Sequence, residues 1–230
     1  LNLIGRFNIT GREAELWRGQ KGTVEPAPFT IDSNSTTVRI SLMENEAVFV
    51  VFGNSYAQAS RVIFPKQYST LSELTGEWQL NFPKGYGAPD NASMQQLSSW
   101  TAHTDEGIKY FSGTATYRKT FEVKREWLKA GQTILLNLGV VKDIAEVTIN
   151  GKKLDILWAS PFETDITSAV TSGTNNLEIS VTNQWTNRLR GDQDHPDKKI
   201  LSSLPAPFGR RQYELTESGL MGPVKLIAVK

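Results

Sequence analysis

Residues 183–197 form the part of the sequence richest in side chains that could bind a ligand. An indole offers a flat apolar face to a sugar ring, while amides, guanidinium groups and carboxylates exchange hydrogen bonds with sugar hydroxyls. The candidates for contact with carbohydrate or with another domain are Trp100, Trp158, Asn183, Trp185, Asn187, Arg188, Asp192 and His195. We expect residues 183–197 to form a loop, and long loops are common sites of both ligand binding and interdomain packing.

A structural role for the same segment is the stronger alternative. Trp185 could fill the end of a β-sandwich, and Arg188 could pair with Asp192 four residues later. We expect the loop to be ordered more by Trp185 than by this ion pair, because a fully exposed pair contributes only ~0–1 kcal/mol. If the loop instead contacts another domain of a longer protein, replacing Arg188 is expected to lower the activity of that protein and to leave the melting temperature of this chain nearly unchanged. A large melting shift would support the structural role. Trp100 and Trp158 could also belong to a core.

Oxygen ligands for calcium could come from Asp192, Asp194 and Asp197. Their spacing lacks the glycine and the final glutamate of the familiar twelve-residue calcium loop, so calcium is a minor alternative. The chain has no cysteine and only two histidines, which excludes disulfides, thiolate metal sites and an imidazole-rich zinc site. The sequence therefore predicts no metal ion and no other cofactor.

The charges of the chain favour a neutral partner. The 25 basic and 24 acidic residues are mixed along the sequence and leave a net charge of +1, which argues against binding to nucleic acid. The longest strongly apolar stretch, residues 47–52, is far shorter than the ~20 residues that cross a bilayer, so no membrane insertion is expected. The chain begins at Leu1 without a signal-peptide pattern, and we expect it to be a C-terminal segment of a longer protein.

Short apolar runs separated by turn-forming residues predict a small β-sandwich in residues 1–68. The predicted strands are residues 3–9, 14–17, 29–31, 38–42 and 47–52. Trp17 is assigned to the core of this sandwich. The boundary with a second domain is expected between residues 53 and 70, because residues 54–60 are polar and Pro65 ends any strand begun at Arg61.

Alternating apolar residues predict a second sandwich in residues 69–230. The inward sets are Trp78, Leu80 and Phe82; Tyr117, Phe121 and Val123; Ile134, Leu136 and Leu138; Ala145, Val147 and Ile149; and Leu177, Ile179 and Val181. Asn150-Gly151 predicts a two-residue hairpin. Helical periodicity is confined to one turn at residues 125–129, so the predicted fold class is all-β.

Several stretches, in order, resemble the sugar-binding jelly roll of β-galactosidase-type enzymes. They are residues 107–117 (GIKYFSGTATY), Leu138-Gly139, residues 145–152 (AEVTINGK), Leu157-Trp158, Pro161-Phe162 and Asp165-Ile166-Thr167. A second set resembles the C-terminal region of large bacterial α-L-rhamnosidases. It comprises Glu15-Leu16-Trp17, residues 48–52 (VFVVF), residues 173–183 (GTNNLEISVTN), Trp185, Asn187-Arg188-Leu189, Gly191-Asp192 and residues 218–224 (SGLMGPV).

This resemblance covers nearly the whole chain. It implies that residues 1–68 end the domain that follows a catalytic barrel, and that residues 69–230 form a galactose-binding-like jelly roll. The catalytic carboxylates of the family lie on that upstream barrel, so the resemblance places no catalytic residue in this chain. It implies a non-catalytic accessory region whose partners are the upstream catalytic domain of the same polypeptide and carbohydrate, located in the periplasm or outside the cell.

The acidic residues of the chain suggest no active site of their own. Glycoside hydrolysis needs two carboxyl groups on either side of the scissile bond. Glu146 and Glu178 fall at solvent-facing positions of predicted strands, where a solvated surface role is the simpler interpretation. An autonomous carbohydrate-binding module and a self-contained hydrolase remain the alternative functions.

Overall fold

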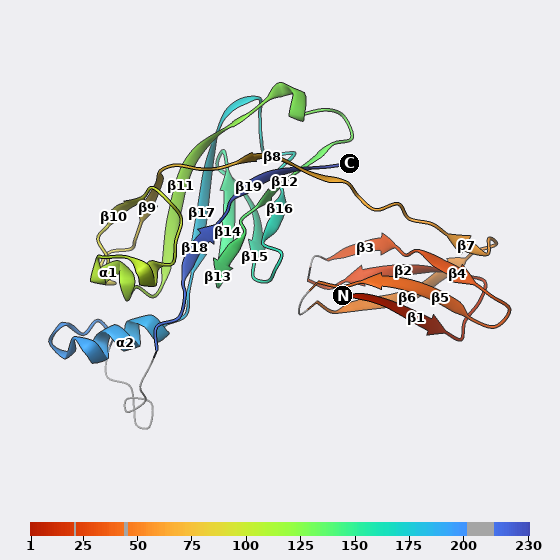
Figure 1. The fold of residues 1–230 in the computed structure, drawn as a ribbon, viewed down its shortest axis with the longest axis horizontal. Coiled ribbons are helices and arrows are strands. Elements are labelled where there is room, and N and C mark those ends of the chain that lie inside the picture. The colour runs from red at the N-terminus through yellow and green to blue at the C-terminus, as the bar shows by residue number, and fades with distance from the viewer. Residues whose placement is uncertain (21, 44–45, 202–213) are drawn as a thin grey trace. The chain divides into compact units, whose positions relative to one another are not determined.

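The computed structural model describes residues 1–20, 22–43, 46–201 and 214–230. The chain divides into two compact units, Leu1–Lys66 and Gln67–Lys230, and each has its own hydrophobic core (Figure 1). The sequence predicted this division after residue 68, whereas the structure places it after residue 66. Gln67 and Lys230 exchange backbone hydrogen bonds of 3.0 and 3.1 Å, which tie residue 67 to the second unit.

Two sheets form the first unit. One has the strand order β1 (Asn2–Phe7), β5 (Thr36–Ser41), β4 (Phe29–Ile31) and β7 (Ser60–Arg61), and the other has the order β3 (Thr23–Pro26), β2 (Arg12–Arg18) and β6 (Val48–Ser55). Their core consists of Ala14, Leu16, Ala27, Phe29, Val38 and Ile40. The five strands predicted before residue 53 are present as β1, β2, β4, β5 and β6.

Trp17 lies outside this core, contrary to its predicted place. Side chains alternate along β2, and because Ala14 and Leu16 point inward, Trp17 points outward and is 45% exposed. Its indole nitrogen donates a 2.9 Å hydrogen bond to the Glu15 carboxylate. The apolar run therefore identified the strand but not which of its faces is buried.

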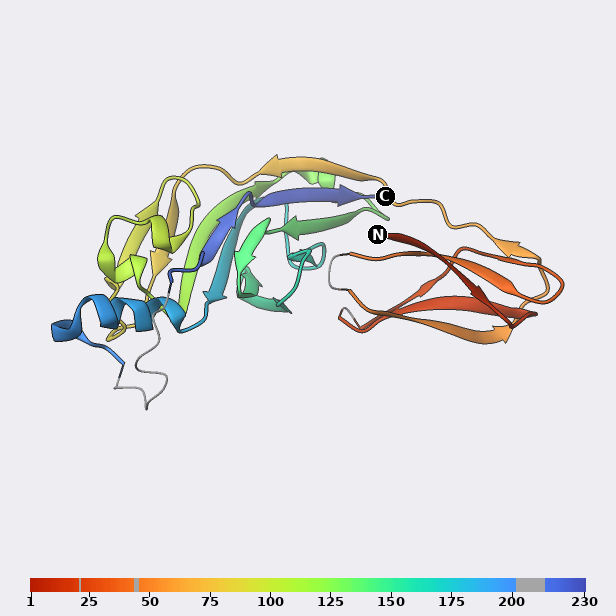
Figure 2. The same ribbon diagram turned by 60° about the horizontal axis from the view of Figure 1, so that its bottom comes forward.

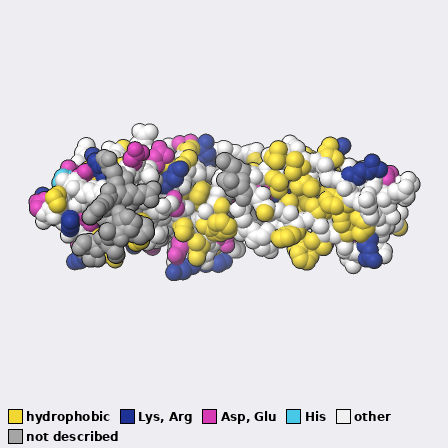
Figure 3. Space-filling model, turned by 90° about the horizontal axis from the view of Figure 1, so that it is seen from below, with side chains coloured by type: hydrophobic (Ala, Val, Ile, Leu, Met, Phe, Trp, Pro, Cys, Tyr) yellow, Lys and Arg dark blue, Asp and Glu magenta, His cyan; other side chains and the backbone are white. Residues whose placement is uncertain are grey.

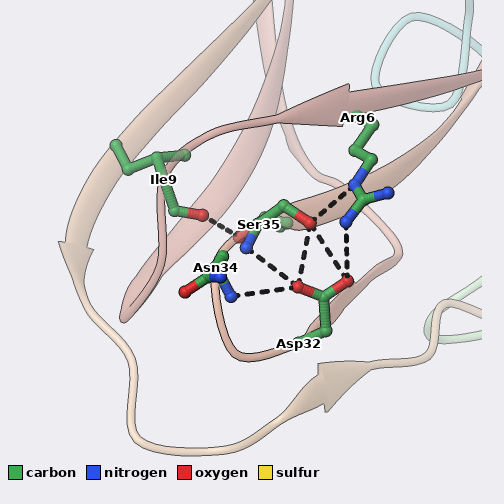
Figure 4. Close-up of polar contacts among 6 residues, drawn as sticks. Arg6, Ile9, Asp32, Asn34 and Ser35 are labelled. Atoms are coloured by element: carbon green, nitrogen blue, oxygen red, sulfur yellow. Dashed lines mark hydrogen bonds and ion pairs between the residues drawn. The ribbon is translucent and has the colours of Figure 1, made fainter.

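A turn built around Asp32 connects β4 to β5 (Figure 4). Oδ1 of Asp32 accepts hydrogen bonds from the backbone N–H groups of Asn34 at 3.1 Å and Ser35 at 2.9 Å, and from the Ser35 hydroxyl at 2.9 Å. Arg6 on β1 donates from Nε to the Ser35 hydroxyl oxygen at 2.8 Å. These hydrogen bonds hold the pKa of Asp32 below its usual value. The bond from the Asn34 backbone N–H has the largest effect, and the bond from the Ser35 hydroxyl has the next largest.

We expect Asp32→Asn to weaken the acid dependence of the first unit's stability. A carboxyl group whose pKa is lowered by folding contributes stability above its unfolded pKa and loses it as the pH falls through its folded pKa. For Asp32 this loss occurs below about pH 4. Urea unfolding, followed through amide resonances of β4 and β5, should show a smaller fall of the midpoint in acid for the variant. Parallel pH profiles for variant and wild type would contradict this expectation.

The second unit is a sandwich of a six-stranded and a four-stranded sheet (Figure 2). The larger sheet has the order β10 (Asn91–Met94), β9 (Trp78–Asn81), β11 (Thr114–Val123), β17 (Gly173–Thr182), β14 (Ile144–Ile149) and β15 (Lys152–Leu157). The smaller has the order β16 (Glu163–Asp165), β12 (Thr133–Asn137), β19 (Lys225–Val229) and β8 (Tyr68–Glu73), and β13 (Val140–Lys142) pairs with β18 (Gly219–Gly222). Every inward set predicted for this unit is buried, and the predicted all-β class is confirmed.

The hairpin predicted at Asn150-Gly151 joins β14 to β15. Both residues have positive φ angles, 51° and 79°, as a two-residue turn requires. The Asn150 side chain also donates a 2.7 Å hydrogen bond to Oδ1 of Asn175 and accepts one of 2.9 Å from the backbone N–H of Asn176. The turn is thereby fixed to the neighbouring strand β17.

The helical segments are short. Among the described residues they are η1 (Trp100–Ala102), α1 (Glu106–Lys109), η2 (Arg125–Trp127), α2 (Thr186–Asp194) and η3 (Pro196–Lys198). Of these, η2 lies in the turn predicted at residues 125–129. Within the described ranges, no helix has both the length and the apolar composition needed to cross a membrane.

Candidate functional site

Several elements meet at one end of the six-stranded sheet, which we term the α2 end. There β11 begins at Thr114, β17 ends at Thr182 and β14 begins at Ile144, and Thr182 pairs with both of the others. The helix α1 precedes β11 and α2 follows β17, so both helices lie at this end (Figure 1). Six of the eight sequence candidates lie on α2 or within three residues of it.

Residues 186–194 form a helix where the sequence predicted a loop. The buried residues of α2 are Asn187, Arg188, Leu189, Gly191 and Asp192. Three of these are polar and one is glycine, so the apolar repeat that identifies an amphipathic helix is absent. Gly191 is fixed by close packing, because a Cβ atom at this position would lie 2.7 Å from Cβ of Tyr110. The helix is held mainly by polar contacts.

Arg188 and Asp192 form a buried ion pair, as predicted for their proximity. Nε of Arg188 lies 3.0 Å from Oδ1 of Asp192, and each side chain is only 8% exposed. The backbone N–H groups of Ile200 and Leu201 also donate to the Asp192 carboxylate, at 3.1 and 2.9 Å. The pair therefore ties α2 to the segment that follows it. Because the pair is buried, replacing Arg188 is expected to lower the stability of this unit, contrary to the expectation drawn from interdomain contact.

Two asparagines fasten α2 to the core of the sandwich. Asn183 donates to the Phe111 carbonyl oxygen and accepts from the Gly113 N–H, both at 2.9 Å. Asn187 donates to the Thr216 carbonyl oxygen at 2.8 Å and to the Ser218 hydroxyl at 3.2 Å. Their amides are thus engaged in backbone-anchoring bonds, which favours the structural interpretation of both residues.

The outer side of α2 carries a second polar group. Asp194 accepts a 2.8 Å bond from Nε of Arg190 and a 3.1 Å bond from the Tyr110 hydroxyl. The Arg190 bond is the main reason that the pKa of Asp194 lies below its usual value. His195 lies 3.5 Å from the Glu106 carboxylate through Nε2, and its ring meets Tyr110 edge-on.

The calcium alternative finds no support in this arrangement. Asp192 is paired with Arg188, and Asp194 is paired with Arg190. Across residues 1–20, 22–43, 46–201 and 214–230, no three acidic, histidine or cysteine side chains are grouped so that they could hold a metal ion.

The three candidate indoles have different environments. Trp100 is fully buried against Phe82, Phe111 and Tyr117, so neither of its faces is available to a ligand and its use as a stacking surface is ruled out in this conformation. Trp158 and Trp185 are 57% and 65% exposed. The expectation that Trp185 orders the segment through burial was wrong, and the buried ion pair takes that role.

The exposed indoles follow the ends of β15 and β17, the two strands that flank β14. Trp158 follows Leu157, which pairs with Ala145, and Trp185 lies three residues beyond Thr182, which pairs with Ile144. Because Ile144 and Ala145 are adjacent, the two indoles belong to the same end of the sheet. The strands that they follow are separated by roughly 10 Å, since neighbouring strands are about 4.8 Å apart. These two exposed indoles, rather than the buried amides, are therefore the sequence candidates at the α2 end that a ligand or another domain could reach.

Sequence reasoning missed the partners that hold α2 in place. Ser112 accepts a 3.0 Å bond from the Arg188 backbone N–H, and Ser218 accepts from Asn187. Tyr110 packs beside Gly191 and binds Asp194. Each of these partners lies 31 to 84 positions in sequence from the α2 residue that it binds, so no local spacing could have indicated them.

The sequence profile of one family matches residues 100–215, which is half of the 230 residues. That family is described as the glycosyl hydrolase 2 galactose-binding domain-like family. The chain belongs to this family. The matched residues include all eight sequence candidates, and the predicted resemblance to a galactose-binding-like domain is confirmed.

Two much larger proteins are similar to this galactose-binding-like chain. A solved rhamnosidase from Novosphingobium sp. PP1Y is 37% identical and matches with a TM-score of 0.88 over 97% of the chain and 21% of its own. A protein of Formosa agariphila named "Putative beta-glucuronidase" is 40% identical over 176 residues, which are 66% of this chain and 15% of that protein. The chain thus spans about a fifth or less of these relatives. The predicted resemblance to a rhamnosidase is confirmed.

Proposed function

We propose that the chain is a non-catalytic accessory region of a longer glycoside hydrolase of the α-L-rhamnosidase type, which acts on plant or bacterial polysaccharide. One observation carries the proposal. The match to the rhamnosidase extends over both units of the chain at a TM-score of 0.88, yet it occupies 21% of that protein. A glucuronidase parent is the competing possibility, because the similar Formosa agariphila protein carries that name.

The α2 end is the part of the second unit that we propose faces the catalytic domain or its substrate. The support is the combination of a rigid polar anchor and exposed aromatic groups. The buried Arg188–Asp192 pair holds α2 against the segment that follows it, while Trp158 and Trp185 remain exposed. A surface that is already ordered before binding loses little conformational entropy when a partner binds, so more of the contact energy appears as affinity.

An autonomous carbohydrate-binding module is the second candidate. The exposure of Trp158 and Trp185 favours it, because sugar rings stack on accessible indoles. Affinity electrophoresis in gels that contain a rhamnose-rich polysaccharide would distinguish the two. An autonomous module is retarded, and the double variant Trp158→Ala, Trp185→Ala migrates freely. An accessory region without its own affinity migrates freely in both forms.

The proposed setting is the periplasm or the outside of the cell, where polysaccharide is encountered. A near-neutral net charge of +1 is compatible with an uncharged carbohydrate partner and gives no attraction to nucleic acid. Fractionation of cells of the source organism would test this placement. The longer protein is expected in the periplasmic or extracellular fraction, and its recovery in the cytoplasmic fraction alone would contradict the proposal.

The chain alone is expected not to hydrolyse aryl α-L-rhamnosides or aryl β-D-glucuronides. The longer polypeptide that contains it is expected to cleave the rhamnoside. The measurement is release of the aryl group by each protein with each substrate. Cleavage of the glucuronide alone would replace the rhamnosidase assignment, and turnover by the 230-residue chain that vanished on replacing one of its own carboxylates would establish a self-contained hydrolase.

A further inference from the structure

The three-stranded sheet of the first unit carries a row of exposed apolar side chains on its outer face. Trp17 on β2 pairs with Val24 on β3 and with Phe49 on β6, so the three side chains project from the same side of neighbouring strands. Trp17, Val24 and Phe49 are 45%, 56% and 67% exposed. The core residues Ala14 and Leu16 point to the other side of β2. The row therefore crosses the solvent side of the sheet.

The next row on this face has a carboxylate at its centre. Glu15 pairs with Pro26 on β3 and with Val51 on β6. Its Oε2 accepts the 2.9 Å hydrogen bond from Nε1 of Trp17, and no other described residue donates to this carboxylate or pairs with it. We term the two rows the Trp17 face, which consists of Val24, Trp17, Phe49, Pro26, Glu15 and Val51.

Glu15 differs from the other charged residues of β2, β3 and β6. Each of those four has a partner within the unit, and the contacts are Arg12 with the Gly53 carbonyl oxygen, Glu13 with Arg61, Arg18 with Glu25 and Arg18 with Glu46. Glu15 is thus the one carboxylate on these three fully described strands that lacks a cationic partner.

An extended apolar row of this kind marks an interaction site. Single exposed apolar side chains are common on soluble proteins, but contiguous ones usually belong to a binding surface. Figure 3 shows one side of the first unit, where hydrophobic side chains gather. Strand pairing identifies which of the exposed apolar residues are true neighbours, and it places Trp17 between Val24 and Phe49.

We propose that the Trp17 face binds a neutral polysaccharide chain. Trp17 and Phe49 offer flat apolar surfaces on which sugar rings stack, and the Glu15 carboxylate accepts hydrogen bonds from sugar hydroxyls. Paired side chains on neighbouring strands lie about 5 Å apart, so the row of three extends over roughly 10 Å and has room for more than one sugar ring. The inference rests on the proposed function only in taking the longer protein to act on polysaccharide.

The Glu15 carboxylate distinguishes between the possible occupants. An apolar protein surface laid over this face would remove Glu15 from water without a cationic partner, which is strongly unfavourable. An acidic polysaccharide would bring further negative charge close to Glu15. A neutral sugar replaces the lost water with hydroxyl donors, and hydrogen bonds to a charged acceptor are stronger than those between neutral groups.

The indole is also oriented before a ligand binds. Glu15 and Trp17 lie two residues apart on the same strand, and the bond from Nε1 to Oε2 restrains the ring. Only one oxygen of the carboxylate is used, so the other remains available to a sugar hydroxyl. A side chain that is ordered in advance loses little conformational entropy on binding.

Native gels that contain a neutral rhamnan, a neutral arabinogalactan or polygalacturonate test the site in the 230-residue chain. We expect retardation by at least one of the two neutral polysaccharides and none by polygalacturonate. Trp17→Ala is expected to weaken this binding by about tenfold or more, as for truncation of an aromatic anchor. Glu15→Gln is expected to weaken it by a smaller factor, about threefold, because the acceptor loses its charge.

Ile4→Ala is the matched control, since it removes an exposed apolar side chain from β1 in the other sheet of the same unit. It should bind like the wild type, and so should the double variant Trp158→Ala, Trp185→Ala, which would place the affinity outside the α2 end. Because Trp17 and Ile4 are both largely exposed, equal melting temperatures are expected for their variants and the wild type.

Free migration of the wild type with both neutral polysaccharides would overturn the inference, as would equal retardation of Trp17→Ala or strongest retardation by polygalacturonate. A protein occupant is tested with Phe49→Cys, because the chain has no other cysteine. Slower maleimide labelling of this thiol in the longer polypeptide would make another domain the occupant, whereas equal rates support an open face. Retained Trp17-dependent binding in a parent that does not cleave rhamnosides would count against the rhamnosidase assignment alone.

Discussion

Replacing Arg188 with leucine is expected to lower the free energy of unfolding of the second unit by about 3 kcal/mol. Removing one member of a buried ion pair costs ~3–5 kcal/mol because the other charge stays buried without its partner. The lower end applies, since Asp192 keeps hydrogen bonds from the backbone N–H groups of Ile200 and Leu201. Chemical unfolding monitored through amide resonances of β11 and β17 would measure the change.

The matched control is Arg190→Leu on the same helix. Arg190 pairs with Asp194 at the same four-residue spacing, at 2.8 Å, but those side chains are 29% and 30% exposed. A pair that is this exposed is expected to contribute only ~0–1 kcal/mol. Equal losses for both variants would show that burial does not distinguish the two pairs. A negligible loss for Arg188→Leu would restore the earlier expectation drawn from the sequence.

Replacing Trp100 with alanine is expected to cost the second unit about 3–5 kcal/mol, the range for truncating a buried aromatic side chain. Trp100 is fully buried and packs against Phe82, Phe111 and Tyr117. The Tyr117 hydroxyl in turn accepts a 3.0 Å hydrogen bond from the Leu220 N–H, so the cavity would adjoin a buried polar contact. Urea unfolding gives the free-energy change.

Trp158→Ala and Trp185→Ala are the comparison for Trp100. Both indoles are mostly exposed, and substitutions at such positions change stability by about 0.5 kcal/mol or less. If Trp100→Ala does not fold, Trp100→Phe keeps most of the packing and should still show a smaller loss in the same direction. A large loss for Trp185→Ala would indicate that this indole anchors α2 after all.

Strands of the second unit were predictable because each presents one face to the core. Side chains alternate along a strand, so sets such as Ile134, Leu136 and Leu138 record the buried face directly in the sequence. The hairpin at Asn150-Gly151 was predictable for a different reason, since few residues adopt positive φ easily. The alternation along a strand and the turn-forming pair are both local patterns, so they can be recognised without knowledge of the rest of the fold.

The α2 end was not predictable in the same way. Helix α2 buries Asn187, Arg188 and Asp192. Residues of these types are usually exposed, so the sequence gives no sign that this face of the helix is buried. The groups that satisfy these polar residues come from distant strands and loops, such as Ser112 and Ser218. The Arg188–Asp192 contact was predicted because its partners are four residues apart on α2. The burial of Trp100 and the exposure of Trp185 likewise depend on how the elements pack.

The first and last strands of the second unit, β8 and β19, lie next to each other in one sheet. Gln67 and Lys230 are joined by reciprocal backbone hydrogen bonds, so this unit has adjacent chain ends. A domain with adjacent ends can be inserted into a loop of another protein, or have its ends joined and reopened elsewhere, without disturbing its core. The second unit can therefore be inserted into a longer chain as a whole. This gives a physical reason why similar sandwiches can occur within large proteins whose names refer to different sugars.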